Sequence, residues 1–487
     1  MSDKKIGWKF NNTYTNLPES MISRLSPTPV KAPKVVLFND SLSKSLDLDF
    51  SKVDEKELAS LFSGNKLPFG SETIAQAYAG HQFGHFTILG DGRALIIGEH
   101  ITQDKKRFDL QFKGSGKTPY SRNADGRAAL GPMLREYIIS EAMYGLKIPT
   151  TRSLAVVKTG EDIVREKNLQ GAILTRVASS HIRVGTFQYA LISKDEDNLK
   201  VLLDYTIGRH YPSIEKSNLP VIELLKIVIE KQINLITEWM RVGFIHGVMN
   251  TDNMTISGET IDYGPCAFMD TYDPSTVFSS IDLHGRYAYC NQPAIAKWNL
   301  ERFAESLIPL IDAEKKTSVK LATSVINNFS EKYKTSWLQM MKRKLGIIEQ
   351  DPDDEKLIIE LLSWMHLKKA DYTNTFCYLM DELHIEDKAY KDSQFILWKM
   401  KWKKRRETKN NTLENSIKIM KDSNPLAIPR NYKVEEALKA ATEYNDITKV
   451  NKLIKIFENP YKIKSDLSIY QVAPSHTNER YQTYCGT

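Results

Sequence analysis

The sequence predicts an α+β protein with two lobes, a small β-rich lobe followed by a larger helical one. Three observations support this fold class. Short apolar segments, separated by glycine and charged residues, follow one another between about residues 87 and 177. One long helical pattern, at 128–144, interrupts them, and a second, at 220–242, follows. Beyond about residue 298 the pattern is almost entirely helical. A nucleotide would fit in the cleft that such lobes form.

The composition is that of an ordinary globular chain. Its 487 residues are 41% hydrophobic and 26% charged, which excludes disorder throughout. A net charge of +7 over this length is too dilute to predict a nucleic-acid partner. No apolar run approaches the roughly 18 residues of a membrane span, and the first residues lack the apolar core of a signal peptide. Four scattered cysteines predict neither a disulfide framework nor a zinc site, so we expect a reduced, cytoplasmic protein.

The elements are expected in a definite order along the chain. Residues 1–70 are rich in turn formers and proline, which predicts an extended segment with one short helix at 54–62. The two long helices each carry an apolar stripe at helical spacing. The expected strands are 93–100, 107–113, 152–158 and 171–177. The expected parts are an extension (1–70), a β-rich lobe (71–180), a helical lobe with a polar loop (181–300) and a helical C-terminal region (301–487).

The first candidate site is the loop at 89–93, Leu-Gly-Asp-Gly-Arg, between two strand-like segments. Asp-Gly is a hairpin-turn signal, and a plain hairpin would account for it. Glycine also lets backbone N–H groups approach phosphate oxygens closely. Gly90 and Gly92 could bind phosphate in this way, and Arg93 would add a charged donor.

Lys113 is the second candidate, because it ends an alternating strand on its polar face. There it is either an exposed strand lysine or a phosphate contact. The long helix predicted after this strand carries Glu136 and Glu141. A helix carboxylate beside the strand lysine would hold the ammonium in place, as in kinases. The pattern leaves open which glutamate does so.

The polar loop after the second long helix carries the most specific pattern. Kinases have a histidine, an asparagine seven residues later and then an Asp-Phe-Gly triplet. His246, Asn253 and Asp262 occupy the corresponding places here. Asn253 and Asp262 offer the oxygen ligands that Mg²⁺ prefers. Val248 stands where kinases have their catalytic aspartate, whereas Asp252 could supply a carboxylate from another angle.

Two arginines stand at and after the end of the last predicted strand: Arg176 and Arg183, with six residues between them. Each by itself is typical of a surface salt bridge. Together with Asp125, Gly126 and Arg127, they could surround a polyphosphate with hydrogen-bond donors.

These motifs resemble the selenoprotein O / YdiU family of protein adenylyltransferases, which has a protein-kinase-like fold. The similar segments cover nearly the whole chain, from FNNTY at 10–14 and YAGHQFGH at 78–85 to IPRN at 428–431. The most specific are HGVMNTDN at 246–253 and IDYGP at 261–265. The resemblance implies that ATP binds flipped relative to kinases. AMP rather than phosphate would then pass to a Ser, Thr or Tyr hydroxyl of a protein.

The resemblance also implies residue roles. Asn253 and Asp262 would hold Mg²⁺ or Mn²⁺. Glu136 would orient Lys113, and Asp252 would accept the hydroxyl proton. UTP is an alternative donor, because YdiU-type members are credited with UMP transfer, and a kinase-like domain can work as a monomer. The residues implied in nucleotide binding are Gly90, Gly92, Arg93, Lys113, Asp125, Gly126, Arg176, Arg183 and Asp262.

The family carries a selenocysteine or cysteine close to its C-terminus, and Cys485 occupies that place here. A thiol near a chain end suits reversible disulfide formation. Cys266, close in sequence to Asp262, is a candidate partner that would link oxidation to the site.

Two other functions fit parts of the pattern. His-Gly followed by Asn and Ile-Asp also occurs in small-molecule phosphotransferases of the aminoglycoside-kinase type, but those keep an aspartate where this chain has Val248. The other is a catalytically inactive, nucleotide-binding scaffold. Such a scaffold would have no need for Lys113, Asn253 and Asp262 together.

Overall fold

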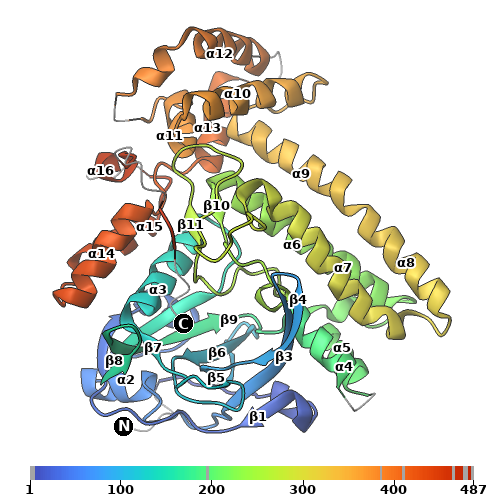
Figure 1. Cartoon of the computed structure of the whole chain (residues 1–487), viewed down its shortest axis with the longest axis vertical. Coiled ribbons are helices and arrows are strands. Elements are labelled where there is room, and N and C mark those ends of the chain that lie inside the picture. Colours follow the sequence, from blue (N-terminus) through green and yellow to red (C-terminus); the bar gives the residue numbers. More distant parts are fainter. Residues whose placement is uncertain are drawn as a thin grey trace.

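The computed structural model describes residues 6–193, 197–383, 386–407, 412–462, 467–474 and 481–483. It confirms the α+β class, with one large antiparallel sheet and many helices, an arrangement consistent with two lobes (Figure 1). The strand order is β1-β3-β5-β6-β9-β8-β2, with β4 paired to β3 and β7 paired to β9. The strands are β1 (Ile22–Arg24), β2 (Lys34–Phe38), β3 (Ile74–Gln82), β4 (His85–Gly90), β5 (Ala94–Ile101), β6 (Arg107–Lys113), β7 (Ala128–Ala129), β8 (Arg152–Val164) and β9 (Asn168–Ala178).

All four expected strands are present, and β8 and β9 are longer than expected because they form one long hairpin. Two strands from the N-terminal segment join the same sheet: β1 pairs with β3, and β2 pairs with β8. Pairing in this way gives the extended segment partners for its backbone polar groups and covers strand edges. The sequence pattern predicted neither β3 nor the bounds of β4, and the small residues of β3 lack a clear apolar alternation.

Three helices belong to the sheet side of the molecule: α1 (Asp40–Ser45), α2 (Glu55–Phe62) and α3 (Leu130–Gly145). The expected helices at 54–62 and 128–144 are confirmed as α2 and α3. The Asp54 carboxylate caps α2 by accepting from the Glu57 N–H at 2.8 Å. α3 is buried along most of its length, and its residues join the main apolar core together with strand residues such as Val156 and Leu174.

The second long helix is confirmed at its expected bounds as α6 (Pro220–Val242). Proline stands at its first turn, and Gly243, with φ of +72°, ends it in the left-handed conformation. The remaining helices are α4 (Val184–Ile192), α5 (Asn198–His210), α7 (Gln292–Ile311), α8 (Lys315–Asn327), α9 (Phe329–Lys344), α10 (Asp354–Lys368), α11 (Tyr372–Leu379), α12 (Ser393–Arg406), α13 (Leu413–Ser423), α14 (Asn431–Glu443), α15 (Thr448–Phe457) and α16 (Leu467–Gln471).

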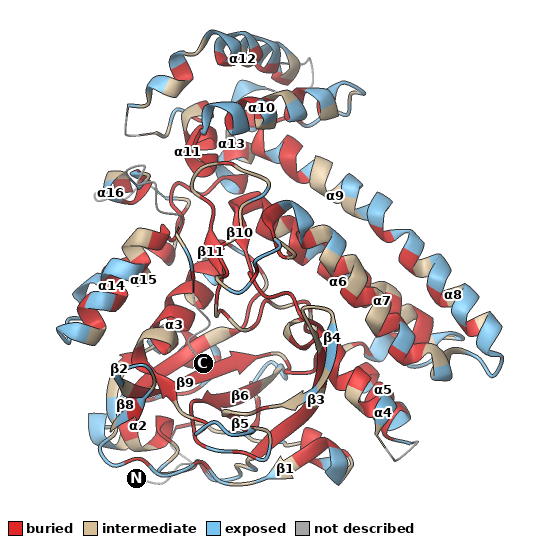
Figure 2. Cartoon of the chain, viewed as in Figure 1, coloured by how far each residue is buried: buried red, intermediate tan, exposed pale blue. Residues whose placement is uncertain are grey.

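The helical pattern expected beyond residue 298 is therefore confirmed. Figure 2 shows that the sheet and the inner faces of the helices are buried, whereas α8, α9 and α12 expose one side each. Within the described residues, no helix combines the length and the apolar character that crossing a membrane requires.

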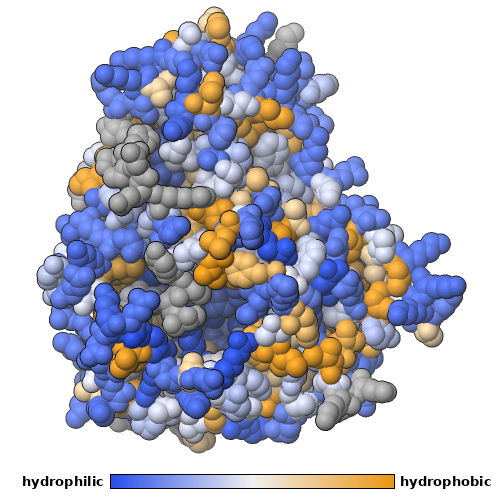
Figure 3. Space-filling model, viewed as in Figure 1, coloured by the Kyte–Doolittle hydropathy of each residue, from blue (hydrophilic) through white to orange (hydrophobic). Residues whose placement is uncertain are grey.

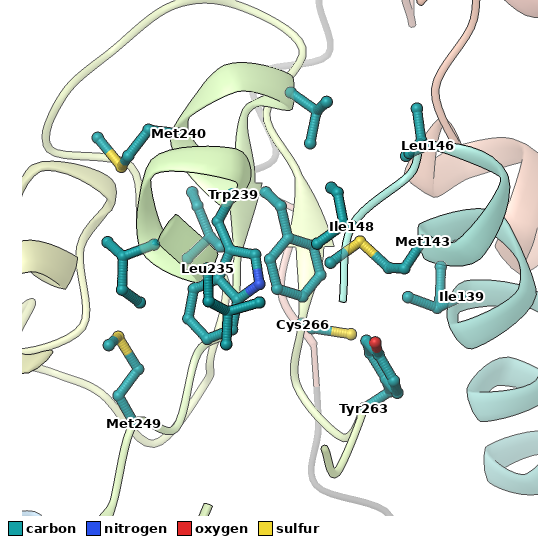
Figure 4. Close-up of a cluster of buried hydrophobic side chains, with 14 of the residues drawn as sticks. Ile139, Met143, Leu146, Ile148, Leu235, Trp239, Met240, Met249, Tyr263 and Cys266 are labelled. Atoms are coloured by element: carbon teal, nitrogen blue, oxygen red, sulfur yellow. The ribbon is translucent and has the colours of Figure 1, made fainter. Parts of the chain in front are cut away.

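The polar loop is held between α3 and α6 by a shared apolar cluster. β10 (Phe244–Ile245) and β11 (Ala267–Phe268) pair at the two ends of this loop. Figure 4 shows Met143 of α3 next to Tyr263 and Cys266, with Trp239 of α6 on the far side of Cys266. All four side chains are at most 3% exposed, so the loop rests on a close-packed support.

Candidate active site

A cavity of about 370 Å³ lies between the sheet and the polar loop. The surface is hollowed near the centre of the face seen in Figure 3. The structure thus brings together residues that are as far apart in sequence as Tyr78 and Pro265. Of the predicted nucleotide, metal and base residues, those that line the cavity are Gly90, Gly92, Arg93, Lys113, Asp125, Gly126, Arg176, Arg183, Asp252, Asn253 and Asp262.

Lys113 takes part in a buried charge network rather than standing exposed on its strand. Its Nζ donates to Glu136 Oε2 at 2.7 Å and to Asp262 Oδ1 at 3.0 Å. Arg176 binds the same two carboxylates, at 2.9 Å from Nε to Glu136 Oε1 and 2.6 Å from Nη2 to Asp262 Oδ1. The choice between the two helix glutamates is thereby resolved, because Glu141 instead pairs with Arg152 at 2.6 Å.

The cations of this network keep both carboxylates ionised. Burial raises the pKa of Asp262, but Arg176, Lys113 and Arg183 outweigh it and hold that pKa well below its usual range. Burial likewise opposes ionisation of Glu136, and Arg176 and Lys113 lower its pKa overall. Asp262 has φ of +64°, the left-handed region, and its side chain is 26% exposed. This strained backbone lets the carboxylate reach the cavity while it binds Lys113 and Arg176.

Arg183 has donors to spare for a ligand. Its guanidinium is 4.5 Å from the centre of the Tyr78 ring, and its Nη1 donates to the His181 carbonyl at 3.0 Å. Its Nη2 lies 3.9 Å from both Asp91 and Asp262, beyond hydrogen-bond distance. Surface salt bridges are therefore the wrong interpretation for Arg183 and for Arg176, since each residue is only 2% exposed.

The loop at 89–93 joins β4 to β5 and is fixed by packing. A β-carbon on Gly90 would lie 2.3 Å from the Tyr120 ring, and one on Gly92 would lie 2.9 Å from the Tyr120 carbonyl oxygen. The hydroxyl of Thr118 donates to the Asp91 carbonyl at 2.7 Å. The Asp91 carboxylate accepts from the Gln76 N–H at 3.0 Å. The glycines are thus required by close approach, whatever ligand the loop holds.

Asp252 is a buried carboxyl with a free oxygen. It is 8% exposed, and its Oδ1 has no hydrogen-bond partner within the described part of the chain. Burial raises its pKa to about 6. The carboxyl packs directly on β3, where a β-carbon on Gly80 would be 2.1 Å from Oδ1. Next to it, Asn253 donates through Nδ2 to the Val248 carbonyl at 3.0 Å.

The residues just before Asp252 attach its loop to the β3–β4 hairpin. Thr251 Oγ1 accepts from the His81 N–H at 2.7 Å. Asn250 Oδ1 accepts from the Phe83 N–H at 3.1 Å and from the Tyr287 hydroxyl at 2.6 Å. Consequently the hairpin and the Asp252 carboxyl are fixed relative to each other.

Asp125 lies at the rim, where its carboxylate forms a 2.8 Å ion pair with Arg165 and is 42% exposed. Arg165 has no recognisable motif around it, so no sequence pattern predicts its position at the cavity. Asp91 and Asn250 were inside motifs already noted, but only the structure shows that they face the cavity. The lining residues that sequence reasoning missed include Tyr78, Gln82, Asp91, Gln111, Asn250 and Arg165.

Of the two cysteines predicted to act in redox regulation, Cys485 lies outside the described residues. Cys266 is fully buried, and burial raises its thiol pKa to about 12. Thr483 lies next to the residue before Cys266, because Thr483 Oγ1 donates to the Pro265 carbonyl at 2.7 Å. The predicted pairing of the two cysteines stays a prediction.

The chain is similar in sequence to known proteins. Residues 4–458 match the family model described as Protein adenylyltransferase SelO. Proteins named protein nucleotidyltransferase YdiU are similar over nearly their whole length. The one from Pelagibacter ubique is 59% identical over 99% of this chain and 100% of its own. Those from Nitrosococcus oceani and Bacillus cytotoxicus are 55% and 54% identical, covering at least 99% of each chain. This chain therefore belongs to the SelO/YdiU family.

Proposed function

We propose that this protein is a nucleotidyltransferase that moves AMP from ATP to a Ser, Thr or Tyr hydroxyl of a protein, with UMP from UTP as the alternative donor reaction. The names of its relatives and of its family support nucleotidyl transfer. The observation that carries the proposal is the position of the carboxyl in the cavity, which is absent at residue 248 and present at residue 252. Val248 occupies the place of a kinase base, while a different carboxyl, Asp252, lines the cavity, and its buried Oδ1 has no hydrogen-bond partner within the described residues.

A protein-kinase-like fold is part of this proposal. Residues 71–180 would be its β-rich lobe and 181–300 its helical lobe, with the extension 1–70 and the region 301–487 added. The pairing of Lys113 on β6 with Glu136 on α3 supports it, since kinases use a strand lysine and a helix glutamate in this way.

The nucleotide would bind through its phosphates. Lys113, Arg176 and Arg183 present cationic donors to the cavity, and the Arg183 Nη2 is 3.9 Å from its nearest carboxylates, beyond hydrogen-bond distance. Backbone N–H groups near Gly90 and Gly92 would add neutral donors. Arg93, Asp125 and Gly126 would hold the remainder of the nucleotide along the cavity wall.

The residues present fit a divalent metal. Asn253 uses its Nδ2 on the Val248 carbonyl, which leaves its amide oxygen as a ligand. Asp262 stays ionised, and its carboxylate reaches the cavity. Amide and carboxylate oxygens suit Mg²⁺ or Mn²⁺. When bound, the metal would neutralise charge on the phosphates and the leaving pyrophosphate.

Asp252 would take the proton in the transfer step. With a pKa of about 6 the carboxylate is mostly ionised at neutral pH, and within the described residues no donor occupies its Oδ1. The acceptor hydroxyl oxygen forms a bond to the α-phosphorus as its proton passes to Asp252. The bond from the α-phosphorus to the bridging oxygen breaks, and pyrophosphate leaves with that electron pair. Positioning and charge stabilisation by the cavity's cations supply most of the rate.

Redox control through Cys485 and Cys266 remains a separate part of the proposal. The position of residues 481–483 beside Pro265 supports it. A tail–core disulfide peptide in a non-reduced digest is the expected result. Its absence from oxidised protein would contradict this part alone.

Intact-mass analysis tests the main proposal. The protein and a protein pool are incubated with ATP or UTP and Mg²⁺ or Mn²⁺, beside an Asp262→Ala variant. We expect a nucleotidyl-sized addition that the variant loses. A phosphoryl-sized addition would favour a phosphotransferase with an unflipped nucleotide. Nucleotide binding without any addition would favour the inactive scaffold.

A further inference from the structure

β4 is an edge strand whose outer side is open. In the part of the chain that the structure describes, β4 pairs with β3 alone. Each of its six residues is exposed or half-buried, and Figure 2 shows it tan and pale blue beside the buried strands. Phe86 is 44% exposed and Ile88 is 59% exposed. The main-chain groups on this outer side are therefore accessible to another strand.

The edge lacks the features that usually prevent such pairing. The segment His-Phe-Thr-Ile-Leu-Gly at 85–90 contains no proline, lysine or glutamate. Its register with β3 runs without a bulge from Gln82↔His85 to Ala77↔Gly90. A regular, apolar, β-prone edge without charged side chains favours addition of a further strand.

The edge is also a wall of the cavity. Tyr78 and Gln82 of β3 and Leu89 of β4 all line it. In the register Tyr78 is opposite Leu89 and Gln82 is opposite His85, so these side chains share one face of the hairpin. Alternate side chains of a strand added to β4 would point to that same face, toward the cavity.

The hairpin is fixed to the loop that carries Asp252. The His81 N–H donates to Thr251, and the Phe83 N–H donates to Asn250. Gly80, which is opposite Thr87 in the register, touches the Asp252 carboxyl. A segment that pairs with β4 would consequently lie at a constant register relative to the proton acceptor.

We propose that the free edge of β4 docks an extended segment of the protein substrate by main-chain pairing, with an acceptor hydroxyl directed to the cavity. This inference rests on the proposed function. A cavity of about 370 Å³ has room for a nucleotide but not for a polypeptide, so the acceptor has to approach from outside. β4 provides both the edge with which the substrate segment would pair and the path by which its hydroxyl would reach the cavity. Main-chain pairing would admit many sequences, and Phe86 and Ile88 would favour apolar neighbours of the acceptor.

Amide hydrogen exchange of the full chain tests the docking without relying on catalysis. The probe is reduced, unfolded β-casein, a hydroxyl-rich chain, added with an ATP analogue that cannot be cleaved between its α- and β-phosphates. We expect exchange at residues 85–90 to slow by about tenfold or more. A Phe86→Lys/Ile88→Lys variant places charges on the edge and should lose this protection.

The same variant separates docking from nucleotide binding. Its kcat/KM for casein should fall by about tenfold or more, with an unchanged Kd for the ATP analogue. Leu367→Lys, at a 69% exposed residue of α10, is the matched control and should behave as the unaltered protein. Unchanged casein modification in the edge variant would overturn the inference.

The remaining outcomes distinguish this inference from the proposed function. Protection of residues 85–90 without any nucleotide transfer would support the docking edge and contradict the transferase. Transfer to casein without protection there would overturn the edge and leave the transferase standing. Dimers that Phe86→Lys/Ile88→Lys dissociates, with no protection by casein, would assign the edge to a second copy of this chain and overturn the inference.

Discussion

Two buried arginine clusters, each with two carboxylates, differ in what surrounds them. In the cavity Arg176 shares Glu136 and Asp262 with Lys113. In the helical region Arg430 binds Asp270 at 2.6 Å and also pairs with Asp371. Arg430 donates further to Asn374 Oδ1 at 3.2 Å and to the Gln471 carbonyl at 3.0 Å.

The difference separates function from support. The Arg430 cluster is closed: its arginine is 1% exposed, and its donors meet side chains and backbone of α11 and of residues 470–471. The cavity cluster has an extra cation and opens on a cavity lined by Arg183 and Asp252, each of which has a buried polar atom without a hydrogen-bond partner in the described residues. A buried ion pair alone therefore indicates little about function. Unsatisfied polar groups on residues that line a cavity are the informative feature.

Lys113→Met should give the largest functional effect. We expect nucleotidyl transfer to fall by at least about 100-fold, because a phosphate donor is lost. The free energy of unfolding should change by about 1–2 kcal/mol, since Arg176 still binds both carboxylates and neutralises one of their two charges. Transfer assays and denaturant unfolding measure the two quantities. Transfer at the original rate would show that the cavity cluster is merely structural.

Arg430→Met should have the opposite profile. Asp270 and Asp371 would be left buried without a cation, at a cost of about 3–5 kcal/mol in unfolding free energy. Burial raises the Asp270 pKa even with Arg430 present, so protonation should relieve part of the loss. The destabilisation should therefore be smaller at pH 5 than at pH 8. An unchanged unfolding midpoint would remove the contrast between the clusters.

The pH dependence of transfer should report Asp252. Because the base must be ionised, the rate should rise about tenfold per pH unit up to about pH 6 and then level off. Asp252→Asn should lower the rate by about 100-fold and abolish that rise. Asp91, whose pKa is also raised to about 6, is the control, and Asp91→Asn should keep the profile.

The raised pKa of Asp252 also predicts how the free energy of unfolding changes with pH. The folded-state pKa of Asp252 lies above its ordinary value of 3.8, so ionising it costs folding free energy. The unaltered protein should lose stability as pH rises from about 4 through about 6, and Asp252→Asn should lose less, because only Asp91 of the two buried carboxyls still ionises there. The variant should then be the more stable protein at pH 8 and no more stable at pH 3. A lower melting temperature of the variant at pH 8 would contradict the buried, ionised carboxyl.

Alanine substitutions at two glycines, Gly80 and Gly208, should give the smallest effect on transfer. Gly80→Ala places a β-carbon 2.1 Å from the present Asp252 Oδ1 position and should lower transfer by about tenfold by displacing the carboxyl. Gly208→Ala, on α5, meets open space. It should leave transfer unchanged and stabilise the fold by about 0.5–1 kcal/mol. Equal transfer by both variants would contradict a fixed Asp252 position.

Sequence patterns predicted the elements that are set by local periodicity. The strand at 107–113 and the helix at 220–242 were found at the bounds of β6 and α6, because alternation and an apolar stripe are properties of neighbouring residues. The β3–β4 hairpin was not predicted. Its glycines and small residues follow from contacts with Asp252 and Tyr120, which are far away in sequence.

By itself, the sequence determined the fold class, the family resemblance and the set of residue types needed for phosphate and metal chemistry. Only the tertiary structure decided that Glu136 rather than Glu141 binds Lys113, and that Arg176 is buried. It also decided that β4 remains an open edge beside the cavity. The reason is physical. Burial, charge pairing and edge exposure depend on which distant segments pack together, and a local pattern of residues does not contain that information.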